Sequence, residues 1–495
     1  MFIAIILSFI ILYFYWNFIY KRQGLPPGPI PLPFIGNTLT LSRSKCPYLP
    51  YKLWSNKYGP IYTFWMGECP IVTVTDYELM HEMFVKNGEA FVGRDFLNHL
   101  SKLVKVHNGS YGVIQTQGET WKIIRRFGLF SMRTLGIGKE GMETQFKEDI
   151  NEMINKLIEN IKLNKGRNIN LQMYIDRLIG STINRLIFGF SFSDNQIEEF
   201  NKIKLTFDKA SHWQFSFCGR LLVAAPCLRY LPFFSQSFVE FENLPLPIYE
   251  YLNKQINNRI KERNKNKQKK EPKDLLDCYF DKIDNEEINP EFNMDNFRAL
   301  CYDLLLAGQE TTGATLSFLV LYLLLDQRVQ SKLHEELDNL VINDSIGLVQ
   351  RPQAHYTNAV INEVQRLCNL LPLNLSHKTM FDVKIMDGKY TLKEGTVVLP
   401  QISCLLYNEK RFLDGNGKLK RFDSFVPFGL GKRACMGESL ARAELFLFTA
   451  NFFHNFQVLP VDPLNPPNNQ KQKTFVVRPT PYNCRLIIRE KKKIQ

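Results

Sequence analysis

The distribution of hydrophobic and polar positions along the chain predicts a mainly helical protein with small β-sheets. Residues 2–20 are almost wholly apolar and about as long as a helix that spans a bilayer. Residues 297–319 are apolar nearly all round, which predicts a long helix through the core. Residues 61–66 and 70–75 are rich in β-branched and aromatic residues and flank a short turn, which predicts a β-hairpin.

The apolar start of the chain is interpreted as an uncleaved membrane anchor. Aromatic residues gather toward the end of residues 2–20, where interfacial side chains belong, and Lys21 and Arg22 follow at once. This positive charge predicts that the rest of the chain lies in the cytosol. A cleaved signal peptide is the alternative, but the segment has no basic region before it and no small-residue cleavage site before Lys21.

The remaining sequence predicts one large domain. Prolines crowd residues 24–33, and they forbid a helix and favour a stiff, extended connector. We therefore predict an anchor at 1–20, a linker at 21–33 and a single domain at 34–495, because no internal repeat divides the chain. Residues 256–273 are strongly basic and rich in amides, which predicts a solvated loop within that domain.

Charge and cysteine content narrow the classes of partner. Lysine and arginine exceed the acidic residues by 62 to 49, a net charge of +13. Such an excess favours an acidic protein partner or an anionic membrane face. No nucleic-acid recognition motif is present, so we predict no nucleic-acid partner. The ten cysteines form no CxxC pair, which is typical of a reducing compartment.

One stretch near the C-terminus concentrates candidate chemistry. Residues 425–438 read FVPFGLGKRACMGE, and Gly429, Gly431 and Gly437 allow the backbone around Cys435 to turn tightly and approach a flat partner. A good helix-forming run follows. Cys435 therefore lies just before a helix N-terminus, where the helix dipole is expected to lower the pKa of a thiol. An isolated cysteine is more often a small buried apolar residue than a ligand.

The pattern Phe428-Gly-x-Gly-x-Arg-x-Cys-x-Gly resembles the haem-binding loop of the cytochromes P450. That resemblance implies a cytochrome P450-like fold and haem b as the cofactor. It also implies that the Cys435 thiolate is the axial ligand of the haem iron, that Arg433 pairs with a haem propionate and that Phe428 packs near the sulfur.

Two further segments resemble the haem-contacting parts of the same family. Trp121 and Arg125 stand four residues apart, which places them on one helix face. Without the resemblance they would be a buried tryptophan beside a surface arginine. The resemblance implies that both reach a haem propionate, that His377 faces a propionate, and that residues 91–115 roof the distal pocket. Buried propionates need such donors because an unpaired buried charge is costly.

The middle of the apolar segment 297–319 carries polar residues. By themselves, the threonines predict a harmless kink in which they bond to the preceding turn. The sequence Ala307-Gly308-x-Glu310-Thr311-Thr312 nevertheless resembles the family's oxygen-activation motif. This implies that Gly308 opens room beside the iron and that Thr311 and Glu310 hold water and relay protons. The residues expected to line the substrate pocket are Leu304, Ala307 and Leu373.

Glu363 and Arg366 resemble the family's E-x-x-R pair behind the haem, and Arg411 resembles the arginine that joins that pair. Alone, such an i,i+3 pair is common on protein surfaces. The segment before the haem loop is shorter than in relatives. Lys410 and Glu409 stand where the family's P-x-R-F motif begins.

The resemblance implies a membrane-anchored haem-thiolate monooxygenase that inserts one oxygen atom of O2 into an apolar or amphipathic small molecule. The sequence has no flavin or nicotinamide fingerprint, so a separate NADPH-dependent reductase is expected to supply electrons. We expect a single-pass protein of the endoplasmic reticulum membrane with its catalytic domain in the cytosol. Two alternatives remain: a membrane-anchored haem or lipid binder without turnover, owing to the shortened segment, and a haem-thiolate isomerase that needs no reductase.

Overall fold

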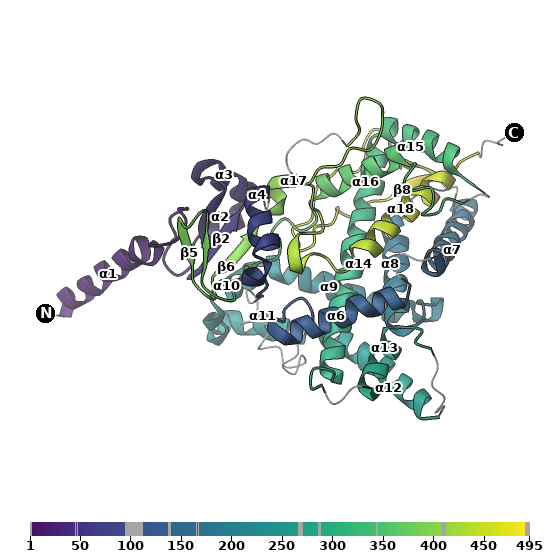
Figure 1. Cartoon of the computed structure of the whole chain (residues 1–495). Coiled ribbons are helices and arrows are strands. Elements are labelled where there is room, and N and C mark those ends of the chain that lie inside the picture. Colours follow the sequence, from purple (N-terminus) through teal and green to yellow (C-terminus); the bar gives the residue numbers. More distant parts are fainter. Residues whose placement is uncertain are drawn as a thin grey trace.

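The computed structural model describes residues 2–44, 46, 48–94, 112–136, 140–164, 166, 168–265, 271–285, 289–342, 345–406 and 412–490. Helices dominate this part of the chain, as the hydrophobic pattern predicts (Figure 1). They are α1 (Phe2–Phe18), α2 (Thr38–Arg43), α3 (Leu49–Tyr58), α4 (Tyr77–His81), α6 (Gly118–Thr134), α7 (Glu140–Asn164), α8 (Leu171–Phe188), α9 (Ile197–Phe215), α10 (Phe217–Ala224), α11 (Pro232–Asn243), α12 (Leu246–Lys265), α13 (Leu275–Asn285), α14 (Met294–Leu325), α15 (Gln327–Leu340), α16 (His355–Cys368), α17 (Ile402–Leu406) and α18 (Glu438–Asn455).

Short strands form small sheets beside the helical body. The largest has the order β1-β2-β6-β3, built from β1 (Ile61–Met66), β2 (Cys69–Val74), β3 (His377–Lys378) and β6 (Val397–Pro400). Antiparallel pairing of β1 with β2 confirms the predicted hairpin, and β6 runs parallel to β2. Two two-stranded sheets pair β4 (Val383–Ile385) with β5 (Tyr390–Leu392) and β7 (Phe456–Pro460) with β8 (Cys484–Ile488).

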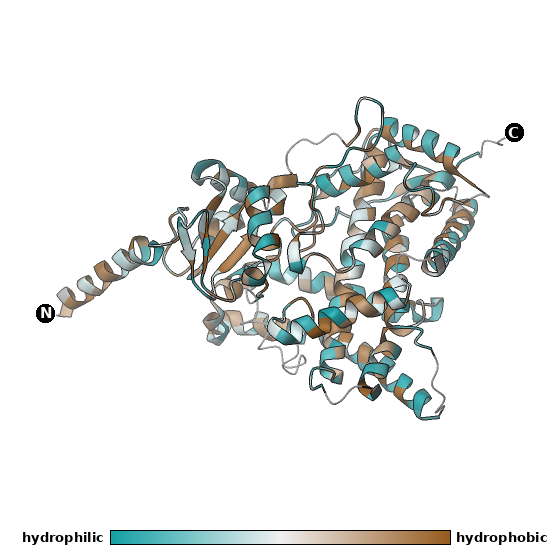
Figure 2. Ribbon diagram, in the orientation of Figure 1, coloured by the Kyte–Doolittle hydropathy of each residue, from teal (hydrophilic) through white to brown (hydrophobic). Residues whose placement is uncertain are grey.

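Helix α1 projects from the body with apolar residues toward its free end (Figure 2). Phe2 is 77% exposed and Phe9 is 69% exposed. The other end of α1 is docked, because the Asn17 side chain donates to the Pro31 carbonyl and Lys21 forms an ion pair with Glu68. No helix forms in the proline-rich segment from residue 23 to residue 37. Its boundaries with the anchor and the domain stay predictions.

Helix α14 passes through the body, as its apolar sequence predicts. The Asn293 side chain accepts a hydrogen bond from the Asn296 N–H and so caps its first turn, while Asp326 ends the helix and caps α15. Among the described helices of at least 18 residues, α14 alone is apolar enough to cross a membrane, and α1 has 17 residues. Its most apolar window is 78% buried within the protein, which is typical of a core helix. Helix α14 packs against α8, α12, α16 and α18.

The prediction of a solvated loop at residues 256–273 is wrong for its first half. Residues 256–265 continue α12, and residues 266–270 lie outside the described part. The helix persists because Ile256 is fully buried in a hydrophobic cluster and because Arg259 pairs with Asp274 and Asp277. Apolar burial at one position thus anchors a segment whose other side chains are polar.

Candidate functional site

The loop before α18 folds back so that Cys435 meets the helix start. Gly431 has φ of +73°, and a Cβ there would lie 2.0 Å from the Phe84 carbonyl oxygen, so a side chain does not fit. The Cys435 N–H donates to the Phe428 carbonyl at 2.9 Å and closes the loop. This turn presents the Cys435 side chain, which is exposed. The Phe428 ring lies 4.7 Å from the Arg442 guanidinium carbon.

Protein groups around Cys435 do not lower the pKa of its thiol, contrary to the sequence-based expectation. Desolvation by the surrounding chain raises this pKa, and the nearby Glu438 carboxylate raises it too. The Gly437 N–H and Arg125 oppose the shift, but their effect is smaller. The helix start therefore does not by itself produce a thiolate. A metal cation would do so, since a coordinated thiol loses its proton.

Arg433 is fixed by backbone carbonyls from two segments far away in sequence. Its guanidinium donates to Val92, Val113 and Thr116 at 2.7, 3.1 and 2.6 Å. The guanidinium carbon also lies 3.9 Å from the centre of the Trp121 ring. These contacts position the arginine at the junction of the Cys435 loop and α6.

Other cations converge on the same junction. Arg94 is buried and donates to the Ser376 carbonyl, while Arg125 donates to the Ala434 carbonyl at 2.6 Å, one residue before Cys435. Burial, reinforced by neighbouring arginines, lowers the pKa of Arg94 to about 9 and that of Arg433 to about 8. In the described part of the chain, none of these three arginines forms an ion pair with an acid.

We call Arg94, Arg125 and Arg433 the cationic cluster, and His377 lies beside it. The buried His377 ring lies with its Nδ1 2.6 Å from the Phe91 carbonyl. Burial and then the charge of Arg94 lower its pKa well below the usual value, so the ring is uncharged at neutral pH. Its one N–H, on Nδ1, donates to the Phe91 carbonyl. Sequence reasoning placed Arg125, Arg433 and His377 here but missed Arg94, whose surroundings offered no recognisable motif.

Two unsatisfied donors, one in the cluster and one on the neighbouring Trp121, are suited to bind carboxylates. Among the described residues, buried Trp121 Nε1 and Arg94 Nε have no hydrogen-bond partner. Buried donors are normally paired, and buried positive charges need anions. A thiol flanked by such an acid-free cluster suits a group that carries a metal and two carboxylates, as haem does. The residues present therefore fit haem.

Replacing Trp121 by phenylalanine should weaken haem retention without destabilising the haem-free protein. Phenylalanine keeps an aromatic ring but removes an N–H that has no partner among the described residues. One lost hydrogen bond of about 1 kcal/mol corresponds to roughly fivefold faster haem loss. Haem transfer to an acceptor apoprotein measures the loss, and urea unfolding measures stability. Trp54→Phe, at a buried position of α3, is the control. Haem retention in Trp121→Phe equal to that of the wild type would contradict the assignment.

Helix α14 has solvent-accessible residues at the predicted motif. Ala307 is exposed and Thr311 half-exposed within a helix whose flanking turns are buried, whereas Leu304 is only 8% exposed. The Thr311 hydroxyl donates to the Ala307 carbonyl at 2.7 Å. The expectation for Gly308 is wrong: a Cβ there would lie 2.6 Å from Ile183. This glycine permits close packing of α14 on α8.

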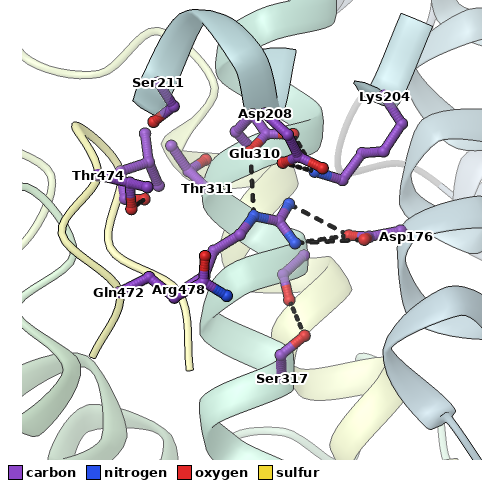
Figure 3. Close-up of polar contacts among 12 residues, drawn as sticks. Asp176, Lys204, Asp208, Ser211, Glu310, Thr311, Ser317, Gln472, Thr474 and Arg478 are labelled. Atoms are coloured by element: carbon purple, nitrogen blue, oxygen red, sulfur yellow. Dashed lines mark hydrogen bonds and ion pairs between the residues drawn. The ribbon is translucent and has the colours of Figure 1, made fainter. Parts of the chain in front are cut away.

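Glu310 does not stand free beside Thr311 but lies in a buried ion network (Figure 3). Its carboxylate is 3.0 Å from Arg478 Nε and 2.9 Å from Lys204 Nζ. Arg478 also pairs with Asp176 of α8 at 3.1 Å, and Lys204 of α9 pairs with Asp208 at 2.5 Å. Only Asp208 is substantially exposed, with 39% of its side chain accessible. Sequence reasoning missed Arg478 and Lys204.

Glu444 connects α18 to the same turn of α14. It is buried and hydrogen-bonds the side chain of Thr312. Burial raises its pKa to about 8, so it is mostly protonated at pH 7. A neutral acid can donate to the threonine hydroxyl and fix α18, which follows Cys435, against α14.

Asp303 of α14 holds the chain that follows the undescribed residues 95–111. Its Oδ2 accepts the N–H groups of Val113 and Ile114, both at 2.7 Å. The carbonyl of Val113 in turn accepts from Arg433, so Asp303 supports the cationic cluster. Residues 91–115, which were predicted to roof the distal pocket, lie largely outside the described part of the chain.

Replacing Asp303 by asparagine should change the pH dependence of stability. Burial raises the pKa of Asp303 to about 7, above its unfolded value of 3.8, so its stabilising contribution falls as pH rises through 7. Asparagine keeps an acceptor oxygen but does not titrate. Relative to the wild type, Asp303→Asn should gain about 2–3 kcal/mol in free energy of unfolding between pH 5 and pH 8. Urea titrations at both pH values measure it. Asp387→Asn, at an exposed position, is the control. The same pH dependence of stability in Asp303→Asn and in the wild type would contradict the prediction.

The remaining predicted residues fall as follows. Arg366 donates to Glu363 at 2.6 and 2.8 Å on α16, while Arg411 lies outside the described residues. Leu373 lines a cavity of about 160 Å3, whereas Leu304 and Ala307 do not.

Comparison with known proteins accounts for this arrangement. The family model for cytochrome P450 matches residues 26–486. Cytochrome P450 2C23 of Rattus norvegicus is 33% identical over 489 residues, covering 96% of this chain and 95% of that protein. Cytochrome P450 2G1 of Oryctolagus cuniculus is 30% identical, covering 99% and 98%, and cytochrome P450 2C8 of Homo sapiens is 31% identical, covering 93% and 94%. The chain therefore belongs to the cytochrome P450 family of haem monooxygenases.

Proposed function

We propose that the protein inserts one oxygen atom of O2 into a small apolar or amphipathic molecule, with electrons from a separate NADPH-dependent reductase. The observation that carries this proposal is the meeting of Cys435 with a cationic cluster that contains no acid among its described partners. Cys435 and the cationic cluster would hold haem there, and haem would supply the chemistry that activates O2.

The cationic cluster would hold the haem carboxylates and so orient the cofactor. Arg433 and Arg125 bind the backbone of the Cys435 loop and of the segments that face it, which leaves further donors of the cluster for a carboxylate. Trp121 Nε1 and Arg94 Nε are donors suited to the same anions, whereas the single N–H of neutral His377 is bound to the Phe91 carbonyl. In this proposal Gly429, Gly431 and Gly437 shape the loop, and Phe428 closes it over the cysteine.

Thr311 and Glu310 are proposed to handle protons. The Thr311 hydroxyl is half-exposed and can hold water beside the opening in α14. Glu310, the residue before it, is buried and connects through Lys204 to the exposed Asp208. Glu310, Lys204 and Asp208 together offer a route by which protons from solvent reach the turn that carries Thr311. Leu304, Ala307 and Leu373 are proposed to contact the substrate, and the Glu363–Arg366 pair to support the loop.

Helix α1 is proposed to anchor the protein in the endoplasmic reticulum membrane, with the domain that follows in the cytosol. Its exposed apolar side chains and the Lys21-Arg22 pair at its end support this orientation. Anchoring would place the domain beside a membrane-bound reductase.

The test measures NADPH and O2 consumption by the full chain in lipid nanodiscs with and without a cytochrome P450 reductase. A monooxygenase consumes both only when reductase is present, and substrate increases the rate. Reductase-independent conversion would favour the isomerase alternative. Haem binding with no consumption under any condition would favour a binding protein without turnover.

A further inference from the structure

Helix α1 meets the body at the end that carries the large sheet (Figure 1). The connector that follows it, residues 24–33, is rich in proline. A proline-rich connector by itself is a semi-rigid spacer that fixes no single angle between the parts it joins. Whether α1 and the domain move together therefore depends on the contacts between them.

Lys21, just after α1, makes the central contact. Its side chain is only 5% exposed, and its Nζ lies 2.6 Å from Glu68 Oε2 in the turn between β1 and β2. The same ammonium lies 4.8 Å from the centre of the Trp16 ring of α1 and 4.4 Å from that of the Trp65 ring of β1. Aromatic faces attract a cation most strongly when it is desolvated, and a buried charge needs an opposite charge. One ammonium thus joins the last turn of α1 to the sheet.

The connector contacts one face of α1. The fully buried Asn17 donates from its side chain to the Pro31 carbonyl at 3.0 Å. The Tyr13 and Phe34 rings are stacked with their centres 5.1 Å apart. Tyr13 and Asn17 stand four residues apart, so they share a helix face. The second oxygen of Glu68 accepts the Phe34 N–H at 3.0 Å, and this carboxylate therefore holds both Lys21 and the connector.

The connector is in turn bound to β1, the edge strand of the large sheet. The Thr63 N–H donates to the Pro27 carbonyl at 3.0 Å, and the Asn37 N–H donates to the Trp65 carbonyl at 2.7 Å. The Trp65 N–H donates to Asn37 Oδ1 at 2.9 Å. Gly28 permits this approach, because a Cβ there would lie 1.8 Å from the Thr63 carbonyl oxygen. The connector is thus part of the sheet edge and does not act as a free spacer.

We infer that α1 and the domain form one rigid body, locked where Lys21 contacts Trp16, Trp65 and Glu68, and that this joint sets the orientation of the domain on the bilayer. The inference rests on the proposed anchoring by α1 and specifies how the anchor holds the domain. A free tether would let the domain rotate against the membrane. With the joint closed, the tilt of α1 in the bilayer also sets the angle of the domain.

The test is a distance distribution between two spin labels, measured by pulsed electron resonance on the full-length haem protein in nanodiscs and in detergent micelles. The labels are attached to unnatural amino acids, because Cys227 and Cys435 are exposed and would also react with a thiol reagent. One label replaces Phe9, which is 69% exposed on α1, and the other replaces Lys384, which is exposed on β4. A rigid joint should give one narrow distribution. A broad distribution in the otherwise unchanged protein would overturn the inference.

Variants locate the lock. The double change Lys21→Gln and Glu68→Gln should broaden the distribution at least about twofold, because residues 19–26 would then approach a free tether with a spread of roughly 15 Å. Lys21→Arg keeps the cation and should keep the narrow distribution. Lys57→Gln is the matched control: Lys57 is exposed on α3 and lies over the Tyr58 ring, away from α1, so its loss should change nothing. A distribution that stays narrow in the double variant would overturn the assignment of the lock to Lys21.

Flotation of the same protein with lipid vesicles reports separately on the proposed anchor. Protein that floats with the vesicles but gives a broad distribution would retain the anchor and overturn the joint. Protein that does not float would overturn the anchor, and with it the role of the joint in orienting the domain on a bilayer. Both labels lie on the protein, so the distribution in micelles still decides whether α1 and the domain form one rigid body.

Discussion

Replacing Arg478 by leucine is expected to lower the free energy of unfolding by about 3–5 kcal/mol, because it leaves the buried Asp176 carboxylate without its cation and Glu310 with Lys204 alone. The Arg478 and Glu310 side chains are 10% and 4% exposed, and Asp176 is 12% exposed. Gly313 makes room for this pairing, since a Cβ there would lie 2.8 Å from Asp176 Oδ1. Urea unfolding of the purified protein measures the loss.

Two comparisons separate the buried network from general effects of losing an arginine. Arg328→Leu removes an arginine that is 83% exposed and paired with Asp326, so it should cost less than about 1 kcal/mol. Adding Asp176→Leu to Arg478→Leu removes the stranded charge together with its partner and should recover part of the stability. A loss below about 1 kcal/mol in Arg478→Leu, or no recovery in the double variant, would contradict this description of the network.

Replacing Cys435 by alanine is expected to abolish both the thiolate-type carbon monoxide spectrum and reductase-dependent turnover. Cys435 lies on the loop that the cationic cluster contacts, because Arg125 donates a hydrogen bond to the Ala434 carbonyl. Alanine removes the proposed iron ligand and retains the cluster, so some haem should still bind. The spectrum of the reduced protein with carbon monoxide, recorded beside a turnover assay, measures both effects.

Cys227→Ala is the matched control for that experiment. Cys227 is also exposed but lies in the turn between α10 and α11, outside the Cys435 loop. Its loss should leave spectrum and turnover unchanged. A thiolate-type spectrum that persists in Cys435→Ala would remove Cys435 as the ligand and point to another cysteine.

Local sequence patterns predicted the elements that carry the site because those elements form from local rules. The all-round apolar segment is α14, the Trp121–Arg125 spacing lies on α6, and the helix-forming run after Cys435 is α18. Gly431 also has the positive φ that the predicted tight turn requires. Each of these features depends on neighbours within a few residues.

The features that were missed depend on contacts between distant segments. Arg94 reaches the cluster through Ser376, a separation of 282 residues, and Arg478 reaches Glu310 across 168 residues. The spacing of residues along the sequence does not indicate contacts between segments so far apart. Gly308 was misread for the same reason, because only the position of α8 shows that Ile183 lies against it. The pKa of Cys435 was misjudged since desolvation depends on the whole surrounding fold.

We propose that Cys435 binds haem iron as a thiolate within the loop held by the cationic cluster. The carbon monoxide difference spectrum of the dithionite-reduced, full-length protein tests it most directly. We expect a Soret band at the red-shifted position characteristic of cytochromes P450. A band at the shorter-wavelength position, or the absence of haem from the purified protein, would contradict it.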